Sequence, residues 1–162
     1  MNYQDQLQRA RRFLHRVENS RVNQILELPP EKQTEYEDML YAFFQNCWHI
    51  KDWIKNDASS PRLLAESVSD TRTLPRSLLL CADIANASKH LRRNTRPHVG
   101  GNIRPEIKVE LTESFVTGES SGRVLYEYRV EDNAGSSEDA LAVARQAMQD
   151  WEALITGNGG RI

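Results

Sequence analysis

The sequence predicts a mainly helical α+β fold: an antiparallel bundle of helices that carries a two-stranded β-hairpin and a C-terminal helix. Three observations support this prediction. Apolar residues recur at intervals of three and four over most of 3–92, two segments at 107–111 and 124–130 alternate apolar and polar residues, and a last helical stripe follows over 140–155. A chain of 162 residues, 39% of them hydrophobic, is long enough to form one core.

The composition favours a cytoplasmic protein that does not enter the membrane. No apolar run approaches the roughly 20 residues that a membrane helix needs. The polar first residues also lack the apolar core of a secretion signal. In a reducing compartment, Cys47 and Cys81 are interpreted as small buried hydrophobes rather than as a disulfide, because each lies within a helical apolar stripe.

The first two elements are predicted to be long amphipathic helices. Over 3–28 the apolar stripe comprises Tyr3, Leu7, Ala10, Phe13, Leu14, Val17, Ile25 and Leu26. Pro29 and Pro30 end this helix. A second helix follows over 31–56, and its acid-rich first stretch suits the positive end of the helix dipole. Two long helices joined by a Pro-Pro corner form an antiparallel hairpin.

Shorter helices complete the bundle, which we expect to span residues 1–105. Ser60 is a candidate cap and Pro61 a candidate first residue for a short helix over 62–68. A break then leads into a helix over 74–92. Two prolines and a Gly-Gly pair predict a loop over 95–105.

The segment 106–156 is predicted to be a β-hairpin followed by a helix, packed on the bundle as part of one domain. The alternating apolar residues are Ile107, Val109 and Leu111 in the first strand and Val124, Tyr126, Tyr128 and Val130 in the second. A Gly- and Ser-containing connection at 117–122 joins them. Residues 136–139 supply a helix cap. Because an isolated hairpin is barely stable, we expect it to rest on the last helix, and we expect 157–162 to fray.

Charge gives a weak indication of partners. With a net charge of −2, the molecule as a whole is not electrostatically complementary to nucleic acid. Positive residues nevertheless form two clusters. The first comprises Arg9, Arg11, Arg12, Arg16 and Arg21, and the second comprises Lys89, Arg92, Arg93, Arg96 and Arg104. Each is interpreted either as a solvated face or as a binding surface, and the second adjoins the polar residues described next.

Asp83, Asn86 and His90 share one face of the helix predicted over 74–92. One interpretation is a partly exposed polar surface, with His90 placed favourably near the helix C-terminus. The other is a catalytic site, because His is the side chain that titrates near neutral pH without help. In that site His90 acts as general acid or base, Asp83 fixes its tautomer, and Asn86 supplies hydrogen bonds.

A second polar stripe, comprising Gln45, His49, Asp52 and Asn56, lies on the helix predicted over 31–56. His49 and Asp52 are candidate binding residues that face Asp83 and His90 across one shared site. The alternative is that these residues have only a structural role, at the edge of a core into which Trp48 and Trp53 pack.

The sequence carries no recognised metal or nucleotide motif. A metal set drawn from His49, Asp52, Asp83 and His90 lacks the Glu-x-x-His pairs typical of helical bundles. HExxH, P-loop, GxGxxG and GxSxG motifs are absent. We therefore expect neither a metal nor another cofactor. The sequence indicates no catalytic or metal-binding partner for His15 or His98.

The helical part resembles the HEPN superfamily of prokaryotic toxins, antiviral systems and nucleotidyltransferase partners. Its active members share an Arg and a His separated by four to six residues, often with a polar residue after the Arg. Here Asp83 stands where the Arg would precede His90, and Asn86 and His90 follow it; Arg93-Asn94-Thr95-Arg96-Pro97-His98 also meets the spacing.

The resemblance implies a metal-independent endoribonuclease that works as a homodimer, in a toxin, defence or mobile-element system. The Arg would stabilise the scissile phosphate while His assists attack by a ribose hydroxyl. With His90 as that histidine, Lys89, Arg92 or Arg93 would supply the positive charge. Residues 106–156 lie outside the resemblance. The alternative is a non-enzymatic protein-interaction module, in which both polar stripes are structural.

Overall fold

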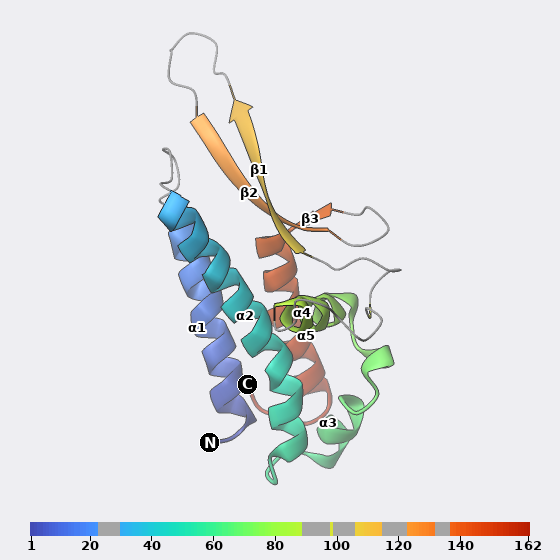
Figure 1. The fold of residues 1–162 in the computed structure, drawn as a ribbon. Helices are drawn as coiled ribbons and strands as arrows, with labels where there is room; N and C mark the ends of the chain where they lie inside the picture. The colour runs from blue at the N-terminus through green and yellow to red at the C-terminus, as the bar shows by residue number, and fades with distance from the viewer. Residues whose placement is uncertain (23–29, 89–97, 99–105, 115–122, 132–136) are drawn as a thin grey trace.

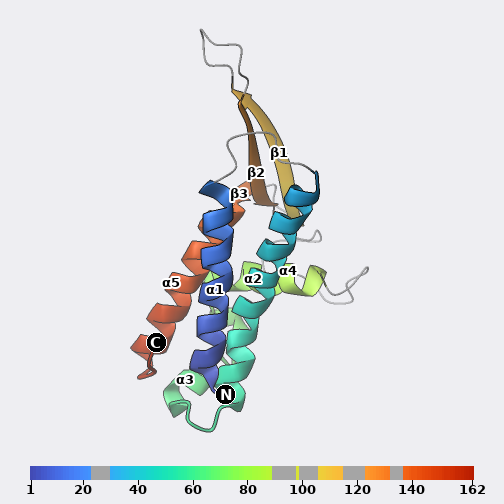
Figure 2. The same cartoon turned by 90° about the vertical axis from the view of Figure 1, so that its left-hand side faces the viewer.

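Two long antiparallel helices organise the molecule. The computed structural model describes residues 1–22, 30–88, 98, 106–114, 123–131 and 137–162, to which the structural statements below refer. Helices α1 (Tyr3–Val22) and α2 (Pro30–Asn56) lie side by side, which confirms the predicted helical hairpin (Figures 1 and 2). Of the predicted helix over 3–28, residues 23–29 lie outside the described part of the chain.

Helix α5 (Ala140–Gly157) lies alongside this pair, and α4 (Arg76–Ala87) crosses α2 and α5 steeply (Figures 1 and 2). The short helix α3 (Arg62–Ser67) and the 3₁₀ turn η1 (Thr71–Thr73) connect α2 to α4. The mainly helical α+β fold is therefore as predicted. No helix in the described ranges is long and apolar enough to cross a membrane.

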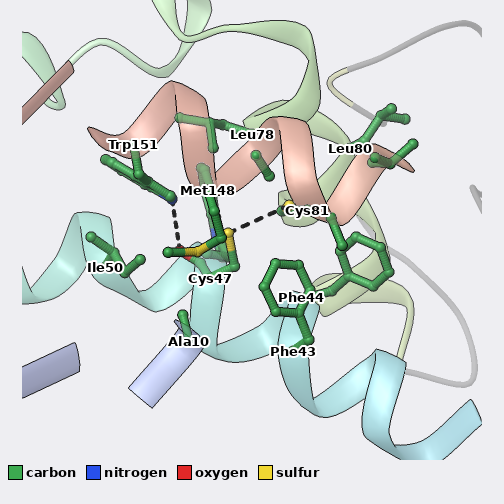
Figure 3. Packing of buried hydrophobic residues seen from close by; sticks show 14 of the residues in the cluster. Ala10, Phe43, Phe44, Cys47, Ile50, Leu78, Leu80, Cys81, Met148 and Trp151 are labelled. Carbon is green, nitrogen blue, oxygen red and sulfur yellow. Dashed lines mark hydrogen bonds between the residues drawn. The ribbon is translucent and has the colours of Figure 1, made fainter. Parts of the chain in front are cut away.

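Buried side chains from α2, α4 and α5 pack together around Cys47 (Figure 3). Cys47 and Cys81 are both free and fully buried, with their sulfur atoms 3.8 Å apart. This confirms that they are buried hydrophobes. Trp151 is also fully buried, and its indole N–H donates to the carbonyl oxygen of Cys47 at 3.0 Å. The indole therefore joins α5 to α2 without leaving a polar atom unpaired.

A hairpin of β1 (Glu106–Ser114) and β2 (Arg123–Glu131) projects beyond the ends of the helices (Figures 1 and 2). The two strands are antiparallel, as predicted. At the base of the hairpin β2 contacts α5, also as predicted. There Tyr128 is buried, and its ring centroid lies 4.4 Å from that of Tyr36 on α2. Packing on two helices thus stabilises a hairpin that would be marginal alone.

The sheet contains a third strand that the sequence analysis did not predict. Strand β3 (Ser137–Asp139) pairs with the outer edge of β2, which gives the order β1-β2-β3. Its three polar residues carry no alternating pattern, so periodicity gave no signal. Asp139 then caps α5 as predicted for 136–139, because its side chain accepts a hydrogen bond from the N–H of Ala142 at 3.0 Å.

Helix α3 begins at Arg62, as predicted, but the roles predicted for Ser60 and Pro61 at its start were wrong. Pro61 occupies the N-cap position with ψ of 139°, so it precedes the first helical residue. Ser60 provides no cap: its hydroxyl is buried and has no hydrogen-bond partner among the described residues. The extended ψ of Pro61 turns the chain into the helix, which leaves the preceding hydroxyl outside hydrogen-bonding reach of the helix end.

Residues 157–162, which were expected to fray, fold back on the bundle. Helix α5 ends in a Schellman motif: Gly159 has φ of 78°, and the N–H of Gly160 donates to the carbonyl of Ile155 at 2.8 Å. The N–H of Arg161 then donates to the hydroxyl of Tyr3 at 2.9 Å. The motif reverses the chain, which brings its end against α1.

Candidate active site

Asp83 is a carboxylate in the interior of the protein. It lies on α4 and is 0% exposed. The backbone N–H of His98 donates to it and lies 2.9 Å from each carboxylate oxygen. Nδ1 of the same residue lies 2.9 Å from Oδ1. Because a buried carboxylate is costly unless it is hydrogen-bonded, these contacts stabilise Asp83 in the fold.

His98 is held by this contact while its ring stays accessible. Its side chain is 29% exposed. A carboxylate can only accept, so the ring donates through Nδ1 to Asp83. In the neutral ring the other nitrogen, Nε2, then carries the lone pair. An imidazole oriented in this way by a carboxylate is suited to accept a proton from a bound molecule.

Helix α2 supplies the neighbouring wall of the site. Trp48 is 7% exposed, and its ring centroid lies 6.0 Å from that of His98. Nζ of Lys51 lies 4.5 Å from the Trp48 centroid and 3.1 Å from Oδ1 of Asp52. The ring and the carboxylate together hold the ammonium on the same wall as Trp48. The site therefore combines a carboxylate and an imidazole, and a cation contacts the neighbouring Trp48 ring.

A direct contact also joins α2 to the C-terminal end of α4. Nε2 of Gln45 donates to the hydroxyl of Ser88 at 2.8 Å. Gln45 belongs to the second polar stripe, and Ser88 follows Asn86 on the other element. Gln45 of the second polar stripe therefore contacts the end of α4 at Ser88, a residue outside the first stripe.

The candidate residues on α2 are not all directed at this site. Asp52 contacts Lys51 but also lines a separate hollow with Trp53 and Asn56. His49 is half-buried on the same helix.

Of the three residues predicted to be catalytic, the structure describes Asp83 and Asn86. Asp83 is buried, and Asn86 is half-buried near the end of α4. Asp83 is therefore not part of an exposed polar surface. His90, Lys89, Arg92 and Arg93 lie outside the described residues, so their roles stay predictions.

The contact between Asp83 and His98 was not predicted from the sequence, in which no pattern gives His98 a partner. The available signal was the string 93–98, which satisfies the Arg–His spacing and ends at His98. The string lies beyond the predicted helix, so helical periodicity gave no reason to place His98 against Asp83.

Two further observations bear on the class of the site. Within the described ranges, no group of three or more His, Cys, Asp and Glu side chains is arranged to hold a metal ion. No family model, curated protein or solved structure matches this chain. The candidate site is therefore described from its own geometry: in a helical bundle, a buried carboxylate orients a partly exposed histidine.

Proposed function

We propose that this protein is a HEPN-like, metal-independent endoribonuclease in which His98 is the catalytic acid or base. The observation that supports this most directly is the contact between Nδ1 of His98 and the buried carboxylate of Asp83 at 2.9 Å. It gives the ring one orientation and one tautomer, which a general base needs. The second reason is that His98 ends the string 93–98, whose spacing resembles that of the family.

In the proposed reaction Nε2 of His98 takes the proton of a ribose 2′-hydroxyl. The 2′-oxygen attacks the adjacent phosphorus, and the bond from phosphorus to the 5′-oxygen breaks. The products are a 2′,3′-cyclic phosphate and, after the 5′-oxygen is protonated by His98 or solvent, a 5′-hydroxyl. Asp83 is the positioning residue, because it holds the ring and stabilises the imidazolium that forms.

Positive charge near the scissile phosphate is assigned to two residues. Lys51 stands over Trp48, whose ring neighbours that of His98. Arg93 is the second positively charged residue, and it is assigned only from the family resemblance. Their charges would stabilise the negative charge that develops on the phosphoryl oxygens.

The setting of the reaction follows from the same resemblance. The substrate is RNA, the active form is a homodimer in which two such sites meet, and the protein belongs to a cytoplasmic toxin, defence or mobile-element system. Size measurements by light scattering test the dimer separately from cleavage.

The test is cleavage of a labelled single-stranded RNA in excess EDTA by four proteins: the wild type, His98→Ala, His90→Ala, and His15→Ala as an exposed control on α1. We expect the His98→Ala variant to lose at least about 100-fold in rate. The other two variants should stay within a few-fold of wild type. Circular dichroism checks that each variant is folded.

Two results would contradict the proposal in different ways. Loss of cleavage in the His90→Ala variant with activity kept in His98→Ala would move the catalytic role to His90. No cleavage by the wild-type protein would favour the interaction module instead. One observation supports that second function: Asp83 binds the backbone N–H of His98 with both oxygens, an arrangement that anchors the chain whether or not the ring reacts.

A further inference from the structure

Helix α4 crosses α5 (Figure 1). Residues of these two helices and of β3 line a second hollow. Its volume is about 360 Å³, within the range of roughly 300–1,000 Å³ typical of small-molecule sites. The lining residues include Arg76, Ser77, Leu80, Glu138, Val143, Gln146 and Asp150. They come from three elements that are far apart in the sequence.

Asp150 is the polar centre of this hollow. The hydroxyl of Ser77, a residue only 7% exposed, donates to its Oδ2. Nε2 of Gln146 donates to its Oδ1 at 3.0 Å. A carboxylate has about four lone-pair sites, so each oxygen keeps room for a further donor. The two protein donors fix the orientation of the carboxylate for such a ligand.

The charges lining the hollow do not balance. Arg76 and Glu138 form an ion pair at its rim. That pair neutralises itself, which leaves the negative charge of Asp150. No described side chain forms an ion pair with Asp150. This charge also affects the core. The pKa of the Cys81 thiol is raised mainly by burial, next by Cys47 and to a smaller extent by the charge of Asp150. A partly buried carboxylate without a countercharge favours a cationic ligand.

The floor of the hollow is apolar. Leu80 is 1% exposed and Val143 is 4% exposed, and both line it. An alkyl chain packed on these side chains would lose its contact with water, while its charged end reaches Asp150.

We propose that this hollow binds a small alkylguanidinium. A guanidinium presents parallel N–H donors that match the two oxygens of a carboxylate. An ammonium is a compact point charge and uses that geometry less well. The ligand's alkyl chain lies on Leu80 and Val143, and its guanidinium pairs with Asp150.

The test is titration with three probes of one shape, butylguanidinium, butylammonium and the neutral butylurea, followed by calorimetry or NMR. We expect butylguanidinium to bind with a dissociation constant of about 1 mM or below, at least about 5-fold tighter than butylammonium. Butylurea should bind at least about 10-fold more weakly. No saturable binding of butylguanidinium up to about 20 mM, or equal binding of butylurea, would overturn the proposal.

Two pairs of variants locate the site. Asp150→Asn should weaken butylguanidinium binding at least 10-fold, whereas Glu66→Gln on α3, which removes a carboxylate outside the hollow, should leave it unchanged. Ala142→Phe fills the hollow from its exposed wall, and Ala153→Phe places the same ring at an exposed position of α5 outside it. We expect only the first of these two to abolish binding. Unchanged binding in the Ala142→Phe protein would refute the location even if Asp150→Asn failed to fold.

Discussion

Nδ1 of His98 lies 2.9 Å from Oδ1 of Asp83, a side chain with no exposed surface. The same carboxylate accepts the backbone N–H of His98. Asp83 therefore has two effects. It orients an accessible imidazole, and it anchors His98, which lies 15 positions later in the chain, to α4. The two effects can be separated by measuring stability and catalysis on the same variants.

Replacing Asp83 with Ala should destabilise the protein by about 2–4 kcal/mol, because three donor contacts to a buried carboxylate are lost and its site is left empty. His98→Ala should cost less, about 1–2 kcal/mol, because it keeps the backbone N–H. Urea unfolding followed by circular dichroism measures both values. The control is Asp38→Ala, an exposed carboxylate on α2 that should cost under about 0.5 kcal/mol. A loss for Asp83→Ala equal to that control would show that the contact contributes nothing.

Lys51 is expected to act on the substrate rather than on the fold. If its ammonium faces the phosphate, Lys51→Gln should lower kcat/KM for RNA about 10-fold at low salt and reduce the dependence of kcat/KM on salt. Lys55→Gln is the matched control, since Lys55 is an exposed lysine in the last turn of the same helix. Equal effects of the two substitutions would indicate a general electrostatic contribution, and Lys51 would lose its assigned role.

The sequence was sufficient for most of the fold because its apolar stripes are long. Residues of α1 such as Tyr3, Leu7 and Val17 fall at helical spacing, and all three are buried. Strand β3 could not be found in this way, since its three polar residues are held by the edge of β2 rather than by an apolar pattern. Similarly, the return of Arg161 to Tyr3 depends on a tertiary contact that local propensity does not encode.

The candidate site was predicted only in part, for a related reason. Periodicity on one helix selected Asp83 as a candidate, but it grouped this residue with others on the same helix. The contact with His98 crosses from the helix to the chain beyond it. Likewise, the placement of Lys51 over Trp48 depends on rotamers that sequence spacing does not determine.

Cys81 predicts a loss of stability at alkaline pH. Burial, with Cys47 close by, raises the pKa of its thiol above the ordinary value of 9.0. In the unfolded chain the thiol ionises near that value, but in the folded protein it stays protonated. Above about pH 9 the unfolded state therefore binds fewer protons, so stability falls as pH rises. Melting temperatures from pH 7.5 to 10.5 should decline more steeply for the wild type than for Cys81→Ala. Parallel curves would contradict this, whatever the constant cost of the substitution.

Gly159 provides a test of whether the C-terminal residues fold back. Its φ of 78° is unfavourable for a side chain with a Cβ atom, so Gly159→Ala should destabilise the protein by about 1 kcal/mol. Gly157→Ala is the matched control: it lies two residues earlier, in the last turn of α5, and a Cβ there would meet no atom within 4 Å. Its effect should be neutral or stabilising by up to about 1 kcal/mol, because alanine favours helix. Both values come from thermal unfolding. If Gly159→Ala proved as harmless as Gly157→Ala, the Schellman motif and the contact between Arg161 and Tyr3 would contribute no stability in solution.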